Sequence, residues 1–109
     1  MSETAFRILG KSSDVPEGYA MPYYLDDLKR RVSVARVAGR LYAFDDLSPT
    51  DGAPLSSGKL IGATIMSPCD GATFDLASGA ALRDPASRAL ATHAVRERDG
   101  GIEVAVSGV

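Results

Sequence analysis

Two short segments of this 109-residue chain share a spacing of residue types that could hold a chemical group between them. They are Ser48-Pro49-Thr50-Asp51-Gly52 and Ser67-Pro68-Cys69-Asp70-Gly71, and each reads Ser, Pro, a variable residue, Asp, Gly. Glycine permits backbone angles that other residues avoid, and proline fixes the direction of the chain. The pattern therefore predicts two loops whose backbone can approach a bound group closely.

The chain has one Cys and one His, and these counts limit the chemistry that it can perform. They exclude an internal disulfide, a zinc site of four Cys, and a zinc site of two Cys and two His. His93 lies far in sequence from both loops, so we expect a packing or surface histidine rather than a ligand. Cys69 has no neighbouring His or basic residue in the sequence to activate it, so we expect a free, half-buried thiol.

Other candidate sites give weaker indications. Asp51, Cys69 and Asp70 could offer a mononuclear divalent ion a few ligands, with oxygens suited to hard cations and sulfur to softer ones. This metal site stays open as a minor alternative.

Acid–base and hydrolytic chemistry have little support in the sequence. Asp45 and Asp46 are neighbours in a predicted strand, so they point to opposite faces and cannot easily share a proton. Ser56 and Ser57 lie in a predicted loop, without a Ser–His spacing typical of a hydrolase. We therefore expect that the chain is not an enzyme.

The composition is that of a single globular domain. Hydrophobic residues make up 45% and charged residues 24% of the chain, and the net charge is −2. No apolar run approaches the roughly 18 residues that span a bilayer, and the first residues lack the pattern of a secretory signal. The one basic run, at 29–31, closely follows two acidic residues. We expect a cytoplasmic protein that binds neither membrane nor nucleic acid.

Short strands are the elements that must position the loops. Eleven Gly and six Pro interrupt the chain, and no stretch keeps apolar residues at helical spacing. The pattern predicts an all-β sandwich or small barrel, with at most one helical turn, at 26–31, and an irregular loop at 47–58. The expected strands are Ala5–Leu9, Tyr19–Leu25, Val32–Val37, Arg40–Asp45, Leu60–Met66, Ala72–Asp75, Ala89–Arg96 and Ile102–Val106.

The residues around the two loops resemble those of a Rieske-type ferredoxin domain over nearly the whole chain. The matching features are, in order, Gly39, Tyr42-Ala43, Asp46, the first loop, Pro54-Leu55, Gly58, the strand ending at Met66, the second loop, Phe74-Asp75 and Gly79. The resemblance is strongest to small single-domain bacterial ferredoxins, which pass electrons to oxygenases and other redox partners. It implies one Rieske-like domain over residues 1–109, with a β-sandwich base of small antiparallel sheets and a two-loop subdomain at about 46–80.

In that family the loops hold a [2Fe-2S] cluster through Cys-x-His in the first loop and Cys-x-x-His in the second. By position, the resemblance places the four ligands at Ser48, Thr50, Ser67 and Asp70, and all four are substituted. A serine hydroxyl holds its proton too tightly to replace a thiolate, and one carboxylate does not hold a [2Fe-2S] unit. We therefore expect no cofactor, although the parent family carries [2Fe-2S].

The resemblance also implies a partner surface at the loop tips, which would meet a protein of a redox system. Its expected residues are Pro49, Asp51, Gly52, Cys69, Gly71 and Pro85. In respiratory-complex Rieske proteins the position of Cys69 forms a disulfide with a first-loop Cys, whose place is taken here by Ala53.

Two functions follow from these observations. The first is a cluster-free binding or structural module, for which the small subunit of some bacterial nitrite reductases is a family-level precedent. The alternative is a ligand-replaced variant of an electron-transfer ferredoxin that serves an oxygenase or reductase system. Without a cluster, we expect loops 48–54 and 67–72 to be more mobile than the sheets, or repacked with the hydroxyls of Ser48, Thr50 and Ser67 bonded to backbone groups.

Overall fold

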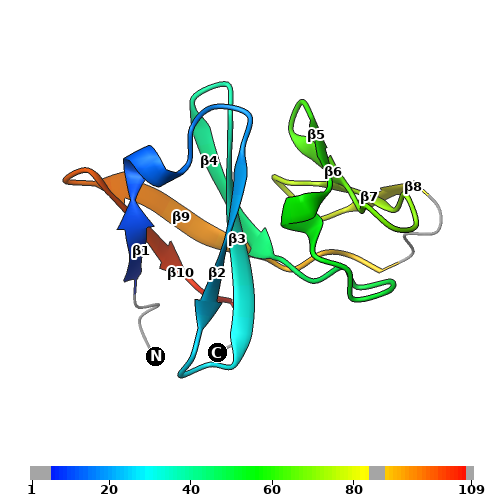
Figure 1. Ribbon diagram of the computed structural model, residues 1–109, viewed down its shortest axis with the longest axis horizontal. Coiled ribbons are helices and arrows are strands. Elements are labelled where there is room, and N and C mark those ends of the chain that lie inside the picture. The colour runs from blue at the N-terminus through cyan, green and yellow to red at the C-terminus, as the bar shows by residue number, and fades with distance from the viewer. Residues whose placement is uncertain (1–5, 84–87, 108–109) are drawn as a thin grey trace.

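The computed structural model describes residues 6–83 and 88–107, which form two antiparallel sheets (Figure 1). The six-stranded sheet has the order β1-β10-β9-β4-β3-β2, and its strands are β1 Arg7–Lys11, β2 Ala20–Leu25, β3 Arg30–Val37, β4 Arg40–Asp45, β9 Thr92–Arg98 and β10 Gly101–Ala105. The four-stranded sheet follows chain order with β5 Lys59–Ile61, β6 Thr64–Met66, β7 Thr73–Asp75 and β8 Ala81–Arg83. The expected all-β class is confirmed.

Helix is limited, in the described part of the chain, to two short 3₁₀ turns. These are η1 Ser12–Asp14 and η2 Leu55–Ser57. No helix in the described part of the chain therefore has the length and apolar character needed to cross a membrane.

The hairpin of β3 and β4 is the centre of the large sheet, and it forms as predicted. Its register runs from Val37↔Arg40 to Val32↔Asp45. Ala38 and Gly39 both have positive φ, of 52° and 77°, as a type I′ turn requires. A positive φ is unfavourable for Ala38. The Glu17 carboxylate stabilises the turn, because it accepts the N–H groups of both turn residues, at 2.5 and 2.8 Å.

Two apolar clusters hold the sheets. One lies within the large sheet and includes Val32, Val34, Ala43, Ile102 and Val104. The other joins the two sheets, because Ala35 and Phe44 of the large sheet pack there against Leu55, Ile65, Ala72, Phe74, Leu76 and Leu90. Each fully buried large apolar side chain contributes about 1.5–3 kcal/mol. The joining cluster therefore fixes the small sheet, and the loops attached to it, against the large sheet.

Several predicted elements differ from the observed ones. The single strand expected at 60–66 is wrong, because Gly62 adopts a φ of 56° and the chain reverses between β5 and β6. The residues at 26–29 form a turn rather than a helical turn, and Arg30 already begins β3. The irregular loop at 47–58 contains η2, and β8 was not predicted. The first strand begins at Arg7, and the strand expected from residue 89 begins at Thr92.

Candidate functional site

The first loop is closed by its own backbone. The N–H of Ser48 donates to the carbonyl of Ala53 (2.8 Å), and the N–H of Ala53 donates to Asp51 Oδ1 (2.9 Å). Gly52 lies between them with a φ of 76°, a conformation that favours glycine. The Ser-Pro-x-Asp-Gly spacing therefore produces a compact loop whose closing contacts come from the chain itself.

The second loop repeats this conformation. The N–H of Ser67 donates to the carbonyl of Ala72 (2.7 Å), and the N–H of Ala72 donates to Asp70 Oδ1 (3.0 Å). Gly71 has the same φ of 76° as its counterpart in the first loop. The repeated sequence pattern thus has a repeated three-dimensional structure.

A chain of hydrogen bonds links the two loops. Thr50 Oγ1 donates to Asp70 Oδ2 across the gap, at 2.6 Å. Ser48 Oγ lies 2.9 Å from Thr50 Oγ1, and because the Thr50 proton is given to Asp70, Ser48 is the donor in that pair. Three of the four side chains singled out in the sequence therefore meet at one place.

Ser67, the fourth of these residues, is only 3% exposed, and its hydroxyl has no hydrogen-bond partner among the described residues. A buried hydroxyl without a partner is costly to a fold. The expectation that all three hydroxyls bind backbone groups is wrong for Thr50, which donates to a carboxylate, and for Ser67. No local sequence pattern predicts the Thr50–Asp70 contact, because it joins residues 20 positions apart.

The Asp70 carboxyl is the charged group of this site. The hydrogen bond from Thr50, and after it the bond from the Ala72 N–H, lower the pKa of Asp70 below its ordinary value. Ser67 also lowers this pKa slightly, although its hydroxyl does not reach hydrogen-bond geometry. The site therefore presents hydroxyl and carboxylate oxygens. No three His, Cys, Asp or Glu side chains within the described ranges lie close enough together to hold a metal ion.

Replacing Thr50 with valine removes the cross-loop donor while keeping the shape of the side chain. We expect the pKa of Asp70 to rise toward its ordinary value, and amide exchange at Gly52 and Gly71 to become faster, because the loops are no longer linked. Both are measured by NMR. Thr64→Val is the matched control, since the Thr64 hydroxyl donates to the carbonyl of Ile61 in another hairpin. An unchanged Asp70 pKa in Thr50→Val would contradict the link.

Asp46 anchors the first loop to the large sheet, a role that sequence reasoning missed. The residue is fully buried, and its Oδ1 accepts hydrogen bonds from Ser33 Oγ (2.7 Å) and the Ser56 N–H (2.8 Å), while Arg31 Nε donates to Oδ2. Its carbonyl accepts the N–H of Leu55 (2.6 Å). Burial raises the pKa of Asp46, but the hydrogen bonds outweigh it and hold the pKa below its ordinary value.

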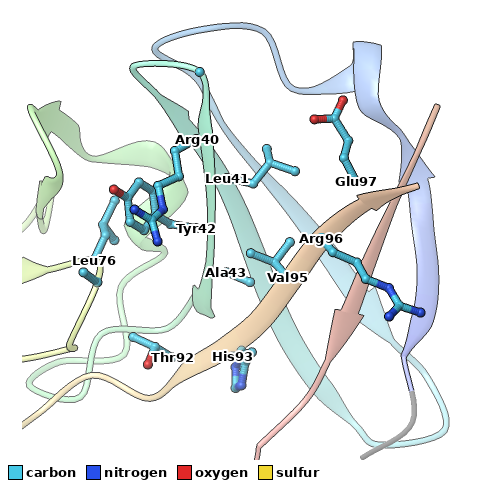
Figure 2. Close-up of a pocket in the computed structure, with 12 residues that line it drawn as sticks. Arg40, Leu41, Tyr42, Ala43, Leu76, Thr92, His93, Val95, Arg96 and Glu97 are labelled. Atoms are coloured by element: carbon cyan, nitrogen blue, oxygen red, sulfur yellow. The ribbon is translucent and has the colours of Figure 1, made fainter. Parts of the chain in front are cut away.

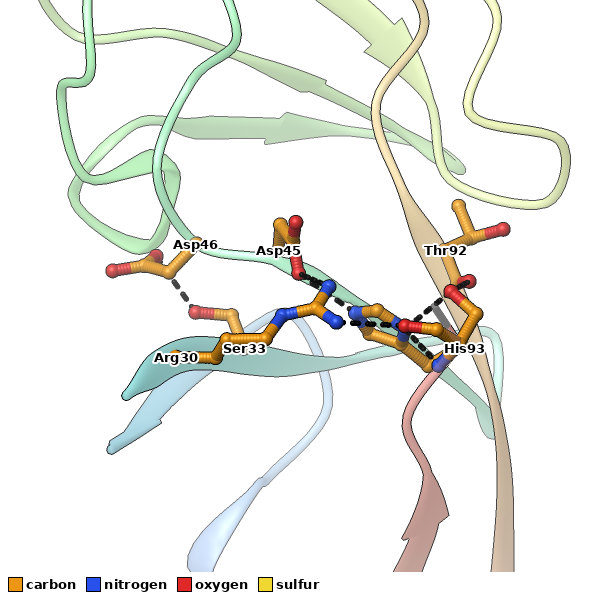
Figure 3. Close-up of polar contacts among 7 residues, drawn as sticks. Arg30, Ser33, Asp45, Asp46, Thr92 and His93 are labelled. Carbon is orange, nitrogen blue, oxygen red and sulfur yellow. Dashed lines mark hydrogen bonds and ion pairs between the residues drawn. The ribbon is translucent and has the colours of Figure 1, made fainter. Parts of the chain in front are cut away.

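Asp45 belongs to a separate network, shown with Asp46 in Figure 3. Asp45 Oδ1 lies 2.8 Å from Arg30 and 2.9 Å from His93 Nε2. His93 Nδ1 accepts the N–H of Ser107 (3.1 Å), so Nε2 carries the ring proton and donates to Asp45. The histidine packs inside the fold, as expected, and the two neighbouring aspartates have different partners.

Asp45, His93 and Ser107 stand in the order of a hydrolase triad, an arrangement that the sequence did not reveal. The lone pair of His93 Nδ1 already accepts the backbone N–H of Ser107, and Ser107 Oγ donates to the carbonyl of Thr92 (3.0 Å). A triad base must be free to take the proton of its serine. These contacts therefore tie β9 to the end of β10 rather than activate a nucleophile.

The loop-tip surface is made of Pro49, Asp51, Gly52, Cys69 and Gly71. Asp51, Gly52 and Cys69 are exposed, and Pro49 and Gly71 are half-buried. The Cys69 thiol is free and exposed, so the expected half-burial is wrong. Pro85, the remaining residue predicted for this surface, lies outside the described residues.

Comparisons with known proteins agree on one fold. A sequence profile of the Rieske-like [2Fe-2S] domain matches residues 6–105, and no curated protein sequence matches the chain. A chain of the complex of reduced oxygenase and oxidized ferredoxin in carbazole 1,9a-dioxygenase is 25% identical, with 94% of both chains covered and a TM-score of 0.87. The Sphingomonas yanoikuyae B1 ferredoxin is 27% identical, with 93% of this chain and 98% of the ferredoxin covered and a TM-score of 0.86.

A larger protein contains a similar domain. The terminal oxygenase of carbazole 1,9a-dioxygenase from Novosphingobium sp. KA1 is 28% identical over 97% of this chain, with a TM-score of 0.82. The match covers 31% of the oxygenase chain.

Proposed function

The chain belongs to the Rieske-like [2Fe-2S] domain family, and we propose that it is a cluster-free member that works as a protein-binding module. The relatives of matching length are ferredoxins, which are electron carriers, and the chain is accordingly not an enzyme. The proposal concerns the cofactor and the partner. It rests on the side chains that stand at the loops and on the exposure of the loop tips.

The donor set does not fit the family's cluster. A Rieske centre needs two thiolates on one iron and two imidazoles on the other. The corresponding positions hold the hydroxyls of Ser48, Thr50 and Ser67 and the carboxylate of Asp70. Hydroxyls keep their protons at neutral pH, so they replace neither the charge nor the polarisability of a thiolate.

The hydrogen bond from Thr50 Oγ1 to Asp70 Oδ2 is the observation that carries the proposal. In the family, the residues at these two positions bind the same iron. Two ligand atoms that each lie about 2 Å from a tetrahedral metal are roughly 3.3 Å apart, so these two oxygens, 2.6 Å apart and hydrogen-bonded to each other, are closer than two ligands of one such iron. The contact supports a direct polar link between the loops in place of the metal.

A protein of a redox system is the proposed partner. The matched structures include a complex of an oxygenase with its ferredoxin. The loop-tip surface of this chain is exposed at Asp51, Gly52 and Cys69, and Leu47 beside it is 48% exposed. An apolar side chain within a polar rim is typical of protein contact surfaces. We propose that the partner binds here.

One observation favours the alternative, a ligand-replaced form of an electron-transfer ferredoxin. Both loops keep the proline, the glycine of positive φ and the same closing hydrogen bonds, and serine, the smallest change from cysteine, stands at both thiolate positions. This retained framework is expected if the ligands were replaced in a functional cluster-binding domain.

Competition in a reconstituted oxygenase system tests the binding function. The chain is added to a reductase, a cluster-bearing ferredoxin and a terminal oxygenase of the carbazole 1,9a-dioxygenase type. We expect no turnover when the chain replaces the ferredoxin, and a dose-dependent loss of turnover when both are present, because both occupy the same face of the partner. Turnover supported by the chain alone would contradict the proposal, as would the absence of any inhibition.

A matched pair of variants locates the contact. Cys69→Arg changes an exposed residue of the loop-tip surface that makes no side-chain hydrogen bond among the described residues, and we expect it to relieve the inhibition. Ile8→Arg is the control, since Ile8 is 73% exposed on β1 of the large sheet. Equal inhibition by both variants would place the contact away from the loops.

A further inference from the structure

The large sheet is open between two of its own strands. In the described part of the chain, β4 and β9 pair only at Ala43↔His93 and Phe44↔Thr92. β4 remains paired to β3 along its other edge, and β9 to β10. Beyond the paired residues the strands diverge, as Figure 1 shows for β9, which follows β10 toward β1 while β4 continues with β3. We call this opening, bounded by residues 40–42 and 94–97, the β4–β9 seam.

Packing explains why the strands separate. Tyr42 packs against the cluster that joins the two sheets, whereas Leu41 and Val95 pack against the cluster within the large sheet. The start of β4 is thus drawn partly toward the small sheet, and β9 is held on the other side by its full ladder with β10. The result is a cavity of about 440 Å³, lined by both strands and by Leu76 and Ala77 (Figure 2).

Backbone groups face each other across the seam. The N–H of Asp45 donates to the carbonyl of Ala91, so both peptide groups point toward the opposite strand. In an antiparallel ladder the direction of the peptide groups alternates with a period of two. The backbone N–H and C=O of Leu41 therefore face β9, and those of Val95 and Glu97 face β4. These groups lie beyond the last paired residues, so the β4–β9 ladder leaves them unused. Figure 2 shows the side chains of Leu41 and Val95 between the diverging strands.

The charge at the rim selects the occupant. Arg40 is exposed and lies over the ring of Tyr42, 5.9 Å from its centre, and no acidic side chain of the described residues pairs with it. The other charged groups are already engaged: Arg96 pairs with Glu103 at 2.7 Å, and Glu97 pairs with Arg36 at 3.5 Å. Among the residues that the structure describes, one free positive charge therefore stands beside a row of unused backbone donors and acceptors.

We propose that the β4–β9 seam binds an extended acidic segment of a partner protein by strand addition to β9. The segment pairs with the backbone of Val95 and Glu97, places an apolar side chain over Leu41 and Val95, and brings a carboxylate to Arg40. An unpaired strand edge is a template for such pairing, and the backbone bonds supply affinity while the side chains supply selectivity. The seam is separate from the loop-tip surface, so this proposal stands or fails independently of the proposed function.

A short synthetic peptide tests the seam. The probe is Thr-Val-Glu-Val-Thr, blocked at both ends, added to the full ¹⁵N-labelled chain and followed by NMR. We expect shifts at the amides of Leu41, Val95 and Glu97 and slower hydrogen exchange there. The same peptide with Lys for Glu tests the charge, and one methylated on the backbone nitrogens of both valines tests the pairing; each is expected to bind at least about fivefold more weakly. Equal binding of all three peptides would overturn the proposal, as would no shift at these amides.

Charge reversal on the protein gives the matched variants. Arg40→Glu is expected to weaken binding of the Glu peptide by about tenfold, the effect of losing an ion pair and gaining a repulsion. Arg83→Glu makes the same change on an exposed residue of β8 and is expected to leave binding unchanged. Arg40 lies at the surface, so both variants are expected to fold. If the two variants bind the Glu peptide equally, Arg40 does not select the occupant and the proposal is wrong.

Discussion

Replacing Asp46 with alanine is expected to lower the free energy of unfolding by about 2–4 kcal/mol, the effect of leaving two hydrogen-bond donors without their acceptor. The change leaves the Ser33 hydroxyl and the Ser56 N–H without their acceptor and Arg31 without its carboxylate. These groups lie where the segment that follows β4 packs against β3. The loss would therefore be felt in both the large sheet and the loop.

Urea unfolding followed by circular dichroism measures this change. Asp46→Asn keeps an oxygen acceptor for Ser33 and Ser56, but it loses the negative charge and turns an amide donor toward Arg31. We therefore expect an intermediate loss in the free energy of unfolding. Asp26→Ala is the control, because the Asp26 side chain is 90% exposed and its ion pair with Lys29 spans 3.8 Å. A loss below about 1 kcal/mol for Asp46→Ala would contradict the anchoring role, since this is the net value of a single ordinary hydrogen bond.

The same carboxylate predicts a dependence of stability on pH. The folded-state pKa of Asp46 lies below the unfolded value of about 3.9. Its ionised form therefore contributes stability above that pH, and the contribution is lost as the pH falls through the folded-state pKa. We expect the free energy of unfolding to fall less steeply for Asp46→Asn than for the unchanged chain as the pH is lowered from about 5 to about 2, a range that brackets the carboxyl pKa. Parallel curves would contradict this assignment.

Placing Cys and His at the four positions where the family carries its cluster ligands is expected to have the second large effect. The variant Ser48→Cys, Thr50→His, Ser67→Cys, Asp70→His replaces the polar link with two thiolates and two imidazoles on loops that already share one conformation. The closing contacts at Ser48 and Ser67 are made by backbone groups, not by the side chains that are replaced. We therefore expect both loops to keep their conformation. Asp70 also accepts the Ala72 N–H, so some adjustment of the second loop is expected.

Anaerobic reconstitution with iron and sulfide, followed by visible and electron paramagnetic resonance spectra, reports the result. Assembly of a cluster with a Rieske-type spectrum would favour the alternative, in which ligands were replaced in a scaffold still fitted for electron transfer. A folded variant that takes up no cluster would favour a long-diverged binding module. The double variant Thr50→His, Asp70→His supplies imidazoles without thiolates and is the control, expected to assemble nothing.

Local patterns in the sequence were enough to predict much of the fold. The β3–β4 hairpin follows from β-branched and aromatic residues on either side of Ala38-Gly39, and the strand at 102–106 from strict alternation. The two loops were found from their repeated Ser-Pro-x-Asp-Gly spacing, and their repeated closure follows from it. In each case the determining interactions lie within a few residues of one another.

Features that depend on distant contacts were missed. Apolar residues on both sides of Gly62 predict one continuous strand, although the glycine permits the turn that separates β5 from β6. In the sequence Asp46 stands out only as a neighbour of Asp45, whereas its role depends on Ser33 and Ser56, which only the folded chain brings together. The same holds for His93 with Ser107, and for the Thr50–Asp70 link. Single residues at long sequence separation leave no local periodicity from which to predict them.

Iron and acid-labile sulfide analysis of the unchanged chain tests whether its loops bind a [2Fe-2S] cluster. The chain is purified anaerobically, reconstituted with iron and sulfide, and freed of unbound metal. We expect iron and sulfide close to zero per chain and no visible absorbance, because the two loops offer hydroxyls and one carboxylate in place of thiolates and imidazoles. Iron and sulfide each near two per chain, with a Rieske-type spectrum, would show that the loops hold a cluster and would overturn the proposed function.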